Sequence, residues 1–153
     1  MKSRHVNELK RHRPAAALIT DDKTSRRLSR VPKAATSPEQ AGAGLLDRNH
    51  IEYARDNKDL PGNPDFADRR RRWAIFVNGC FWHHHSGCPR ATVPKRNTQF
   101  WLDKFEANRK RDERAVVALK EGGFDVHVLW ECEIASAEHH LALRRLTCGS
   151  ADD

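Results

Sequence analysis

Apolar and polar positions show a clear period only after about residue 38 of the chain. The run WAIFV at 73–77 is apolar and partly β-branched and ends at an Asn-Gly pair, which predicts a strand buried on both faces. The sequence LPGNP at 60–64 predicts a turn, because the residue before each proline is excluded from helical backbone. We therefore expect a short strand at 65–68, a solvated tip made by the four arginines at 69–72, and a second strand at 73–77.

A long helix and a third strand are predicted next. Over 98–120, key positions recur at intervals of three and four with charges between them, namely Trp101, Phe105, Asn108, Asp112, Ala115 and Leu119. The glycines at 122 and 123 end this helix. Alternation over 124–130 predicts a strand, with Phe124, Val126, Val128 and Trp130 on one face. Strand, helix and strand form a crossover unit, in which reactive residues collect at strand ends.

Two further helices are predicted outside this unit. Thr36 offers a capping residue, Pro38 suits a first helical turn and Glu39 is favoured near the positive end of a helix. The glycines at 42 and 44 weaken this helix. An amphipathic stretch at 136–146 predicts a closing helix.

Length and charge divide the chain into an arm and one domain. A chain of 153 residues, 38% hydrophobic and 32% charged, can bury a core but cannot hold two catalytic domains. We expect a flexible arm at 1–35, a domain at 36–148 and a tail at 149–153. Residues 1–38 hold ten basic and three acidic side chains, which is the whole net charge of +7.

The arm has the composition of a segment that stays disordered until it meets a polyanion, and nucleic acid is the polyanion expected. We expect its arginines Arg26, Arg27 and Arg30 to contact phosphates. The alternative is a solubilising tail. The sequence has neither a membrane span nor a secretory signal, so we expect a cytoplasmic, nucleoid-associated protein.

The cysteines are spaced as metal ligands. In a reducing compartment thiols bind metal or stay free, and Cys80 and Cys88 enclose three histidines while Cys132 follows the last predicted strand. Three thiolates and one imidazole complete a tetrahedral set that suits Zn²⁺, and four protein ligands make such a site structural. The alternative is two buried core thiols beside surface histidines. Cys148 is expected to be a spare thiol.

Three consecutive histidines are too many for one zinc ion. In an extended loop they would point to alternating sides, which predicts His83 and His85 on one side and His84 on the other. One imidazole can bind metal while another does proton chemistry, because imidazole titrates near neutral pH.

A family resemblance joins these features. The chain resembles the very-short-patch-repair (Vsr-type) DNA mismatch endonucleases from about residue 36 to 134. The blocks that carry the resemblance are Leu60-Pro61-Gly62-x-Pro64-Asp65-Phe66, Gly79-Cys80-Phe81-Trp82-His83-His84-His85, Phe100-Trp101, Asn108-x-x-Arg111-Asp112 and Trp130-Glu131-Cys132.

The resemblance implies an α/β, restriction-endonuclease-like fold with a mixed sheet flanked by helices and a structural zinc site. It implies a Mg²⁺-dependent enzyme that nicks one strand of double-stranded DNA beside a T:G mismatch left when 5-methylcytosine deaminates. We expect a monomer that acts without a membrane, and a mismatch-repair matchmaker protein is a further partner expected from the family.

The resemblance also assigns roles to residues of this sequence. Asp65 matches the magnesium-binding carboxylate, His83 the histidine that acts on the attacking water, and Glu39 a helix acid that organises the site. The zinc ligands match Cys80, His85, Cys88 and Cys132, and the aromatic residues that wedge into the base stack match Phe81, Trp82 and Trp101. Ordinary core packing is the alternative for Trp82 and Trp101, and a plain first-turn acid is the alternative for Glu39.

Two positions depart from one well-known form of the pattern, which has Thr and His where this chain has Val77 and Asn78. A magnesium contact through the backbone carbonyl of Val77 would survive, whereas the Asn78 amide can position a phosphate but cannot titrate. The alternatives to a mismatch nuclease are a zinc-stabilised DNA-binding module without cleavage and a restriction-type nuclease that acts on matched DNA.

Overall fold

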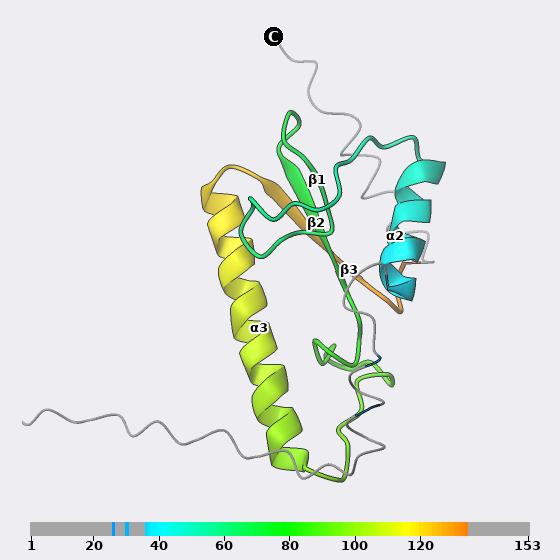
Figure 1. Ribbon diagram of the computed structural model, residues 1–153, viewed down its shortest axis with the longest axis vertical. Helices are drawn as coiled ribbons and strands as arrows, with labels where there is room; N and C mark the ends of the chain where they lie inside the picture. Colours follow the sequence, from blue (N-terminus) through cyan, green and yellow to red (C-terminus); the bar gives the residue numbers. More distant parts are fainter. Residues whose placement is uncertain (1–25, 27–29, 31–35, 135–153) are drawn as a thin grey trace, which may run out of the picture.

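The computed structural model describes residues 26, 30 and 36–134, shown in colour in Figure 1. The elements follow the order α2 (Ser37–Arg48), β1 (Phe66–Asp68), β2 (Trp73–Asn78), α3 (Thr98–Glu121) and β3 (Asp125–Trp130). They confirm the α/β class and the predicted crossover. The predicted arm at 1–35, apart from Arg26 and Arg30, and the predicted helix at 136–146 lie outside the described residues. None of the described helices is long and apolar enough to cross a membrane.

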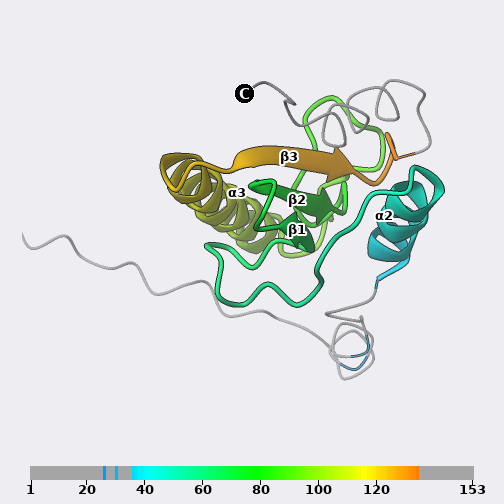
Figure 2. The same cartoon turned by 90° about the horizontal axis from the view of Figure 1, so that it is seen from above.

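The sheet is mixed and lies between the two helices. Its strand order is β1-β2-β3, with β1 antiparallel and β3 parallel to the central β2. Figure 2 shows α2 and α3 on opposite sides of the sheet. Parallel strands need a crossover connection, and α3 supplies it between β2 and β3. The carboxyl ends of β2 and β3 therefore lie at the same edge of the sheet.

The central strand β2 is buried on both faces, as its sequence predicts. Trp73, Ile75 and Val77 pack in the core cluster that includes Leu45 and Leu46 of α2. The side chains between them face α3, where Ala74 and Phe76 pack with Leu119. Two helices thus cover the two sets of alternating residues.

The pattern of β3 is different from the one predicted. Leu129, which the alternation places away from the apolar set, is 2% exposed and packs in the α2-side core, while Val126 packs on the α3 side. Because helices cover both faces of the sheet, apolar residues of both registers are buried in this strand.

Helix α2 packs closely on the sheet because it carries a glycine at the contact. A Cβ atom on Gly42 would lie 3.1 Å from Cγ2 of Val77 and 3.2 Å from Cε2 of Phe66. The glycine that weakens the helix in the sequence therefore permits its approach. Thr36 occupies the N-cap position as predicted, but its hydroxyl donates to the Glu39 carboxylate, 3.0 Å away, and makes no cap hydrogen bond.

The four arginines between β1 and β2 form an exposed tip, as the sequence predicts, and two of them also contact neighbouring parts of the fold. Arg69 donates to both carboxylate oxygens of Asp59 and to the side-chain oxygen of Asn57. Arg72 donates to the carbonyl oxygens at the end of α3 and lies 4.9 Å from the ring centre of Phe124. The tip thus joins the hairpin to the preceding loop and to the end of α3.

Two glycines with left-handed backbone give a matched test of how the turn at 60–64 packs against α3. Gly62 (φ +74°) and Gly87 (φ +73°) have nearly the same φ, but a Cβ on Gly62 would collide with Cβ of Ala115 whereas one on Gly87 would meet nothing within 4 Å. Left-handed backbone costs an alanine about 1 kcal/mol, and crowding adds roughly 1–3 kcal/mol. We expect Gly62→Ala to lower the free energy of unfolding in urea by about 2–4 kcal/mol and Gly87→Ala by about 1 kcal/mol. Equal losses would contradict the crowding at Gly62.

Candidate active site and metal centre

The parallel pairing of β2 and β3 brings distant cysteines together. Asn78 pairs with Trp130 at the end of the ladder, and Cys80 and Cys132 each lie two residues beyond this pair. One ligand atom from each member of the cluster lies within 4.8 Å of all the others, the members being Cys80, His85, Cys88 and Cys132. The cluster contains the four residues predicted as zinc ligands.

The donor set fits a zinc ion. Nδ1 of His85 lies 3.3 Å from Sγ of Cys132 and 3.8 Å from Sγ of Cys80, separations that suit donors around one tetrahedral ion with bonds of about 2.0–2.3 Å. Nε2 of His85 lies 3.7 Å from a carboxylate oxygen of Glu133. A carboxylate behind a ligating imidazole fixes its orientation, as in many zinc sites.

The three histidines occupy turns rather than an extended loop, so the reason predicted for their separation is wrong. Backbone N–H groups at His83, His84 and His85 donate to carbonyls three to five residues earlier, and His84 has a left-handed φ of 47°. The separation itself is present. The rings of His83 and His85 both lie against Trp130, whereas the ring of His84 packs 4.8 Å from that of Phe105.

His83 is hydrogen bonded to a carboxylate of α3. Its Nδ1 lies 2.5 Å from Oδ2 of Asp112. Burial raises the pKa of the Asp112 carboxyl. The hydrogen bonds from His83 and Arg111, and the positive charges of these two side chains, outweigh burial and hold this pKa below its ordinary value. A charged carboxylate can only accept a hydrogen bond, so Nδ1 of His83 is the donor to Asp112.

Asp112 is not among the site residues predicted from the sequence, where it is only part of a motif. A signal was present. It lies on the helix face of Phe105, Ala115 and Leu119, all of them buried. A carboxylate on a buried face needs a polar partner. Residues 79–88, which follow β2 and carry the three histidines, form the histidine loop. Asn108, one turn earlier in α3, likewise reaches this loop and donates to the backbone carbonyl of Trp82 at 2.9 Å.

Asp65 lies directly before β1 and faces the end of β2. Its Oδ2 accepts a hydrogen bond of 2.7 Å from the backbone N–H of Val77. Burial raises the pKa of Asp65 to about 6. The hydrogen bond from the Val77 N–H lowers this pKa, the negative charge of Glu39 raises it further, and the charge of His83 lowers it. The charges of Glu39 and His83 therefore both act on the Asp65 carboxylate.

Val77 and Asn78 are the last two residues of β2. The N–H and C=O of one strand residue point to the same side, so the carbonyl of Val77 faces the side of Asp65. Asn78 is 8% exposed, and its carbonyl accepts the backbone N–H of Glu131 at 3.0 Å. By strand alternation its side chain is on the α3 side of the sheet.

The aromatic residues pack against one another at the amino-terminal half of α3. The ring of Phe81 lies 5.1 Å from that of Trp82, 5.4 Å from Trp101 and 5.5 Å from Phe105, all edge to face. Trp101 is buried, at 8% exposed, whereas Phe81 and Trp82 are half-buried. Core packing, the alternative for Trp101, describes its surroundings in this structure.

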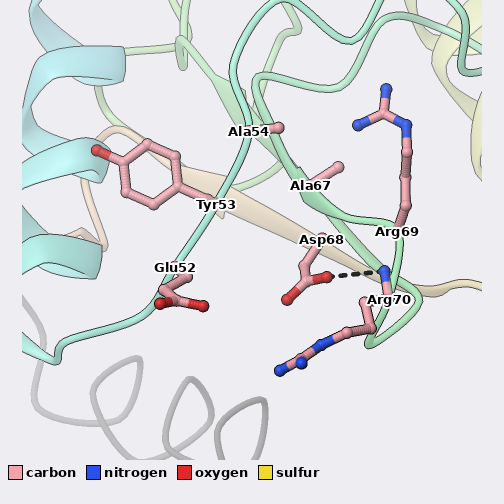
Figure 3. Close-up of a pocket in the computed structure, with 7 residues that line it drawn as sticks. All are labelled: Glu52, Tyr53, Ala54, Ala67, Asp68, Arg69 and Arg70. Atoms are coloured by element: carbon pink, nitrogen blue, oxygen red, sulfur yellow. Dashed lines mark hydrogen bonds between the residues drawn. The ribbon is translucent and has the colours of Figure 1, made fainter.

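The remaining candidates lie elsewhere. Arg26 and Arg30 are exposed, and Arg27 and Cys148 lie outside the described residues. Figure 3 shows a pocket beside β1, where Asp68 accepts the backbone N–H of Arg70. It contains none of the candidate residues, its lining being Glu52, Tyr53, Ala54, Ala67, Asp68, Arg69 and Arg70.

Comparisons with known proteins match this arrangement. A profile of the family described as DNA mismatch endonuclease Vsr matches residues 16–90. The chain is 44% identical over 100 residues to the type II nicking enzyme V.XorIIP of Xanthomonas oryzae pv. oryzae, covering 65% of this chain and 73% of that protein. It is 40% identical over 103 residues to the DNA mismatch endonuclease Vsr of Escherichia coli, covering 67% of this chain and 65% of that protein. A type II nicking enzyme of Neisseria meningitidis, V.NmeAIP, is 34% identical over 117 residues, with coverages of 76% and 83%.

The buried charge of Asp65 gives a stability prediction. Asp65→Asn keeps an acceptor for the Val77 N–H and removes a charge that burial disfavours. The folded protein holds the Asp65 proton more tightly than the unfolded chain, so the wild type loses stability as pH rises from about 4 to about 6 and the variant does not. We expect the variant to be more stable by about 1–3 kcal/mol at pH 7.5, and by less at pH 5, in magnesium-free denaturant titrations. A variant less stable than the wild type at pH 7.5 would contradict the burial of this charge.

The cysteine cluster gives a metal prediction. Cys132→Ser removes one ligand, so we expect stoichiometric zinc to disappear and the thermal midpoint to fall by roughly 10 °C, the equivalent of about 2–3 kcal/mol. Cys148→Ser, the control, should keep both zinc and midpoint. Elemental analysis and thermal unfolding measure the two effects. A stable Cys132→Ser protein with no metal would exclude a structural zinc site.

Proposed function

The chain belongs to the Vsr family of DNA mismatch endonucleases, and we propose that it nicks one strand of duplex DNA beside a T:G mismatch that arises from deamination of 5-methylcytosine. The observation that supports this proposal is that an acid and a base are each held in place by the elements around the carboxyl end of β2, which is five residues before His83. Asp65 is held by Val77 of β2, and His83 is held by Asp112 of α3.

The base in this proposal is His83. Its Nδ1 is committed to Asp112, so Nε2 accepts a proton from the attacking water and the carboxylate of Asp112 stabilises the imidazolium that forms. The electron pair of that water forms the new P–O bond, and the bond from phosphorus to the 3′ oxygen breaks. The 3′ oxygen takes a proton from solvent water, and His83 returns its proton to solvent. The products are a 5′-phosphate and a 3′-hydroxyl end.

The acids of the site fit a hard divalent cation. The charge of Glu39 helps to raise the pKa of Asp65, and a cation would relieve that repulsion. We propose that the Asp65 carboxylate and the Val77 carbonyl hold Mg²⁺, for which oxygen is the preferred ligand. Bound Mg²⁺ supplies charge neutralisation at the phosphate and leaving oxygen. Glu39 organises the site from the first turn of α2, and the Asn78 amide positions the phosphate without titrating.

Mismatch selectivity in this proposal comes from the aromatic cluster. A G:T wobble is weakly stacked, so inserting a ring between its base steps costs less than in matched duplex. Phe81 and Trp82 are partly accessible for this role, and Trp101 is packed behind them. The arginines Arg26, Arg27 and Arg30 add phosphate contacts, and zinc at the cysteine cluster holds the loop that carries both the rings and His83.

A nicking assay tests this function. End-labelled duplexes that differ at one position, G:T, G:C or A:T, are incubated with the protein and Mg²⁺. We expect nicking of the G:T duplex alone, and a fall of about 10²–10⁴-fold in His83→Ala, the range for loss of a general base. Asp65→Ala should abolish nicking. The controls Asp125→Ala and His127→Ala alter an Asp and a His at the other end of β3, where the two side chains contact each other at 3.0 Å, and should nick normally.

The other outcomes would each replace the proposal. Cleavage of all three duplexes would indicate a restriction-type nuclease. Binding without nicking would indicate a DNA-binding module. Nicking of the G:T duplex by His83→Ala at the wild-type rate would remove the histidine from the mechanism.

A further inference from the structure

Trp130 lies between the metal cluster and the proposed catalytic base. Its ring stacks on that of His85, with centroids 4.0 Å apart and planes at 4°. The ring of His83 meets it edge to face, at 6.4 Å and 76°. One side chain therefore contacts both a proposed zinc ligand and the histidine proposed to activate water.

The backbone holds Trp130 firmly at this place. It is the last residue of β3 and pairs with Asn78 of β2. Its carbonyl accepts the N–H groups of Glu133 at 2.8 Å and of Ile134 at 3.1 Å, which turns the chain back toward the cysteine cluster. The main chain of Trp130 therefore has a fixed position relative to the cysteine cluster.

The acidic residues on either side of Cys132 also contact the histidine loop. The carboxylate of Glu131 accepts the backbone N–H of Cys80 at 3.3 Å, and a carboxylate oxygen of Glu133 lies 3.7 Å from Nε2 of His85. The segment 130–133 thus contacts the histidine loop through a ring, two carboxylates and a metal-ligating thiol. Its position and that of the loop depend on each other.

Trp130 lies outside the two core clusters of the described residues. Leu129, directly before it, and Ile134, four residues after it, belong to the α2-side core, whereas Trp130 is half-buried and belongs to neither cluster. Among the described residues, its ring-to-ring contacts are with the two histidines.

A second constraint on His83 is needed for catalysis. Asp112 fixes the ring at one atom, Nδ1, and a ring held at one atom can still tilt about that hydrogen bond. The ring of Trp130, in edge-to-face contact with the His83 ring, opposes this tilt. A displacement of about 1 Å at a reacting group can cost 10²-fold in rate.

We infer that Trp130 is a positioning residue, which transmits the geometry of the cysteine cluster to His83 by stacking on His85. The inference rests on the proposed function, because it takes His83 as the base. It means that metal bound at the cysteine cluster would determine the orientation of the His83 imidazole as well as the stability of the histidine loop.

Variants of Trp130 test the inference. Trp130→Leu keeps an apolar side chain but removes the stacking face, and Trp130→Phe restores a smaller flat ring. We expect Trp130→Leu to keep stoichiometric zinc, to lower kcat on the G:T duplex by about 10–100-fold, as a displaced reacting group should, and to leave KM within about twofold. Trp130→Phe should recover most of the loss. The control Val126→Ala truncates a residue at the other end of β3 and should keep kcat.

Two readouts do not depend on nicking. The His83 proton that is hydrogen bonded to Asp112 should give a downfield proton NMR signal, assigned by its loss in His83→Gln and in Asp112→Asn. We expect Trp130→Leu to shift or broaden this signal with zinc still bound, and to release zinc to a chelator faster than the wild type. Val126→Ala should change neither.

The outcomes that would overturn the inference are distinct from those that would overturn the function. An unchanged His83 signal and zinc release rate in Trp130→Leu would refute positioning, whether or not the wild type nicks DNA. An equal fall of kcat in Val126→Ala, or no rescue by Trp130→Phe, would reduce Trp130 to general packing. A wild type that nicks no duplex refutes the proposed function, while the signal and zinc release still decide what Trp130 positions.

Discussion

The parallel ladder between β2 and β3 is the constraint on which the site depends. Its last pair, Asn78 with Trp130, sets the positions at which the two chains leave the sheet. Cys80 and Cys132 follow at the same distance from that pair and so meet, although 51 residues separate them in sequence. A shift of one residue in this register would turn the side chains of one strand to the opposite face and separate the two thiols.

Helix α3 joins the site to the core. Its carboxyl-terminal half carries Leu119, which packs under the sheet, and its middle carries Asn108 and Asp112, which hold the histidine loop. Its amino-terminal half extends past the sheet, where Trp101 and Phe105 pack with the rings of that loop (Figure 1). One rigid element thus fixes the sheet, the proposed base and the aromatic cluster relative to one another.

Local pattern was sufficient for the elements but not for their contacts. The apolar run at 73–77 and the periodic helix after residue 98 are in the structure, because such patterns reflect burial directly. Leu129 was assigned to the wrong set, since a strand covered on both faces buries residues of either register. The histidine turns were read as extended, because the hydrogen bonds that form them leave no periodic signal over so few residues.

The four residues of the cysteine cluster could be expected from donor chemistry and family pattern together, and the structure brings them within reach of one ion. The partner of His83 could not be expected in the same way. Asp112 is 29 residues away, and only the packing of α3 against the loop shows that they meet. The arginines at 69–72 look alike in sequence, yet Arg69 and Arg72 differ in their partners, since these come from the loop before β1 and from the end of α3.

The bare backbone at Gly42 has a consequence for the acids of the site. Glu39 precedes Gly42 by three residues and therefore lies on the same side of α2, one turn away. Helix α2 packs on Val77 and Phe66 at Gly42, where a Cβ atom would push it away from the sheet. The absence of that Cβ therefore helps to set the distance from Glu39 to Asp65. The spacing of the two carboxylates that we propose for the site thus depends on a residue that has no side chain.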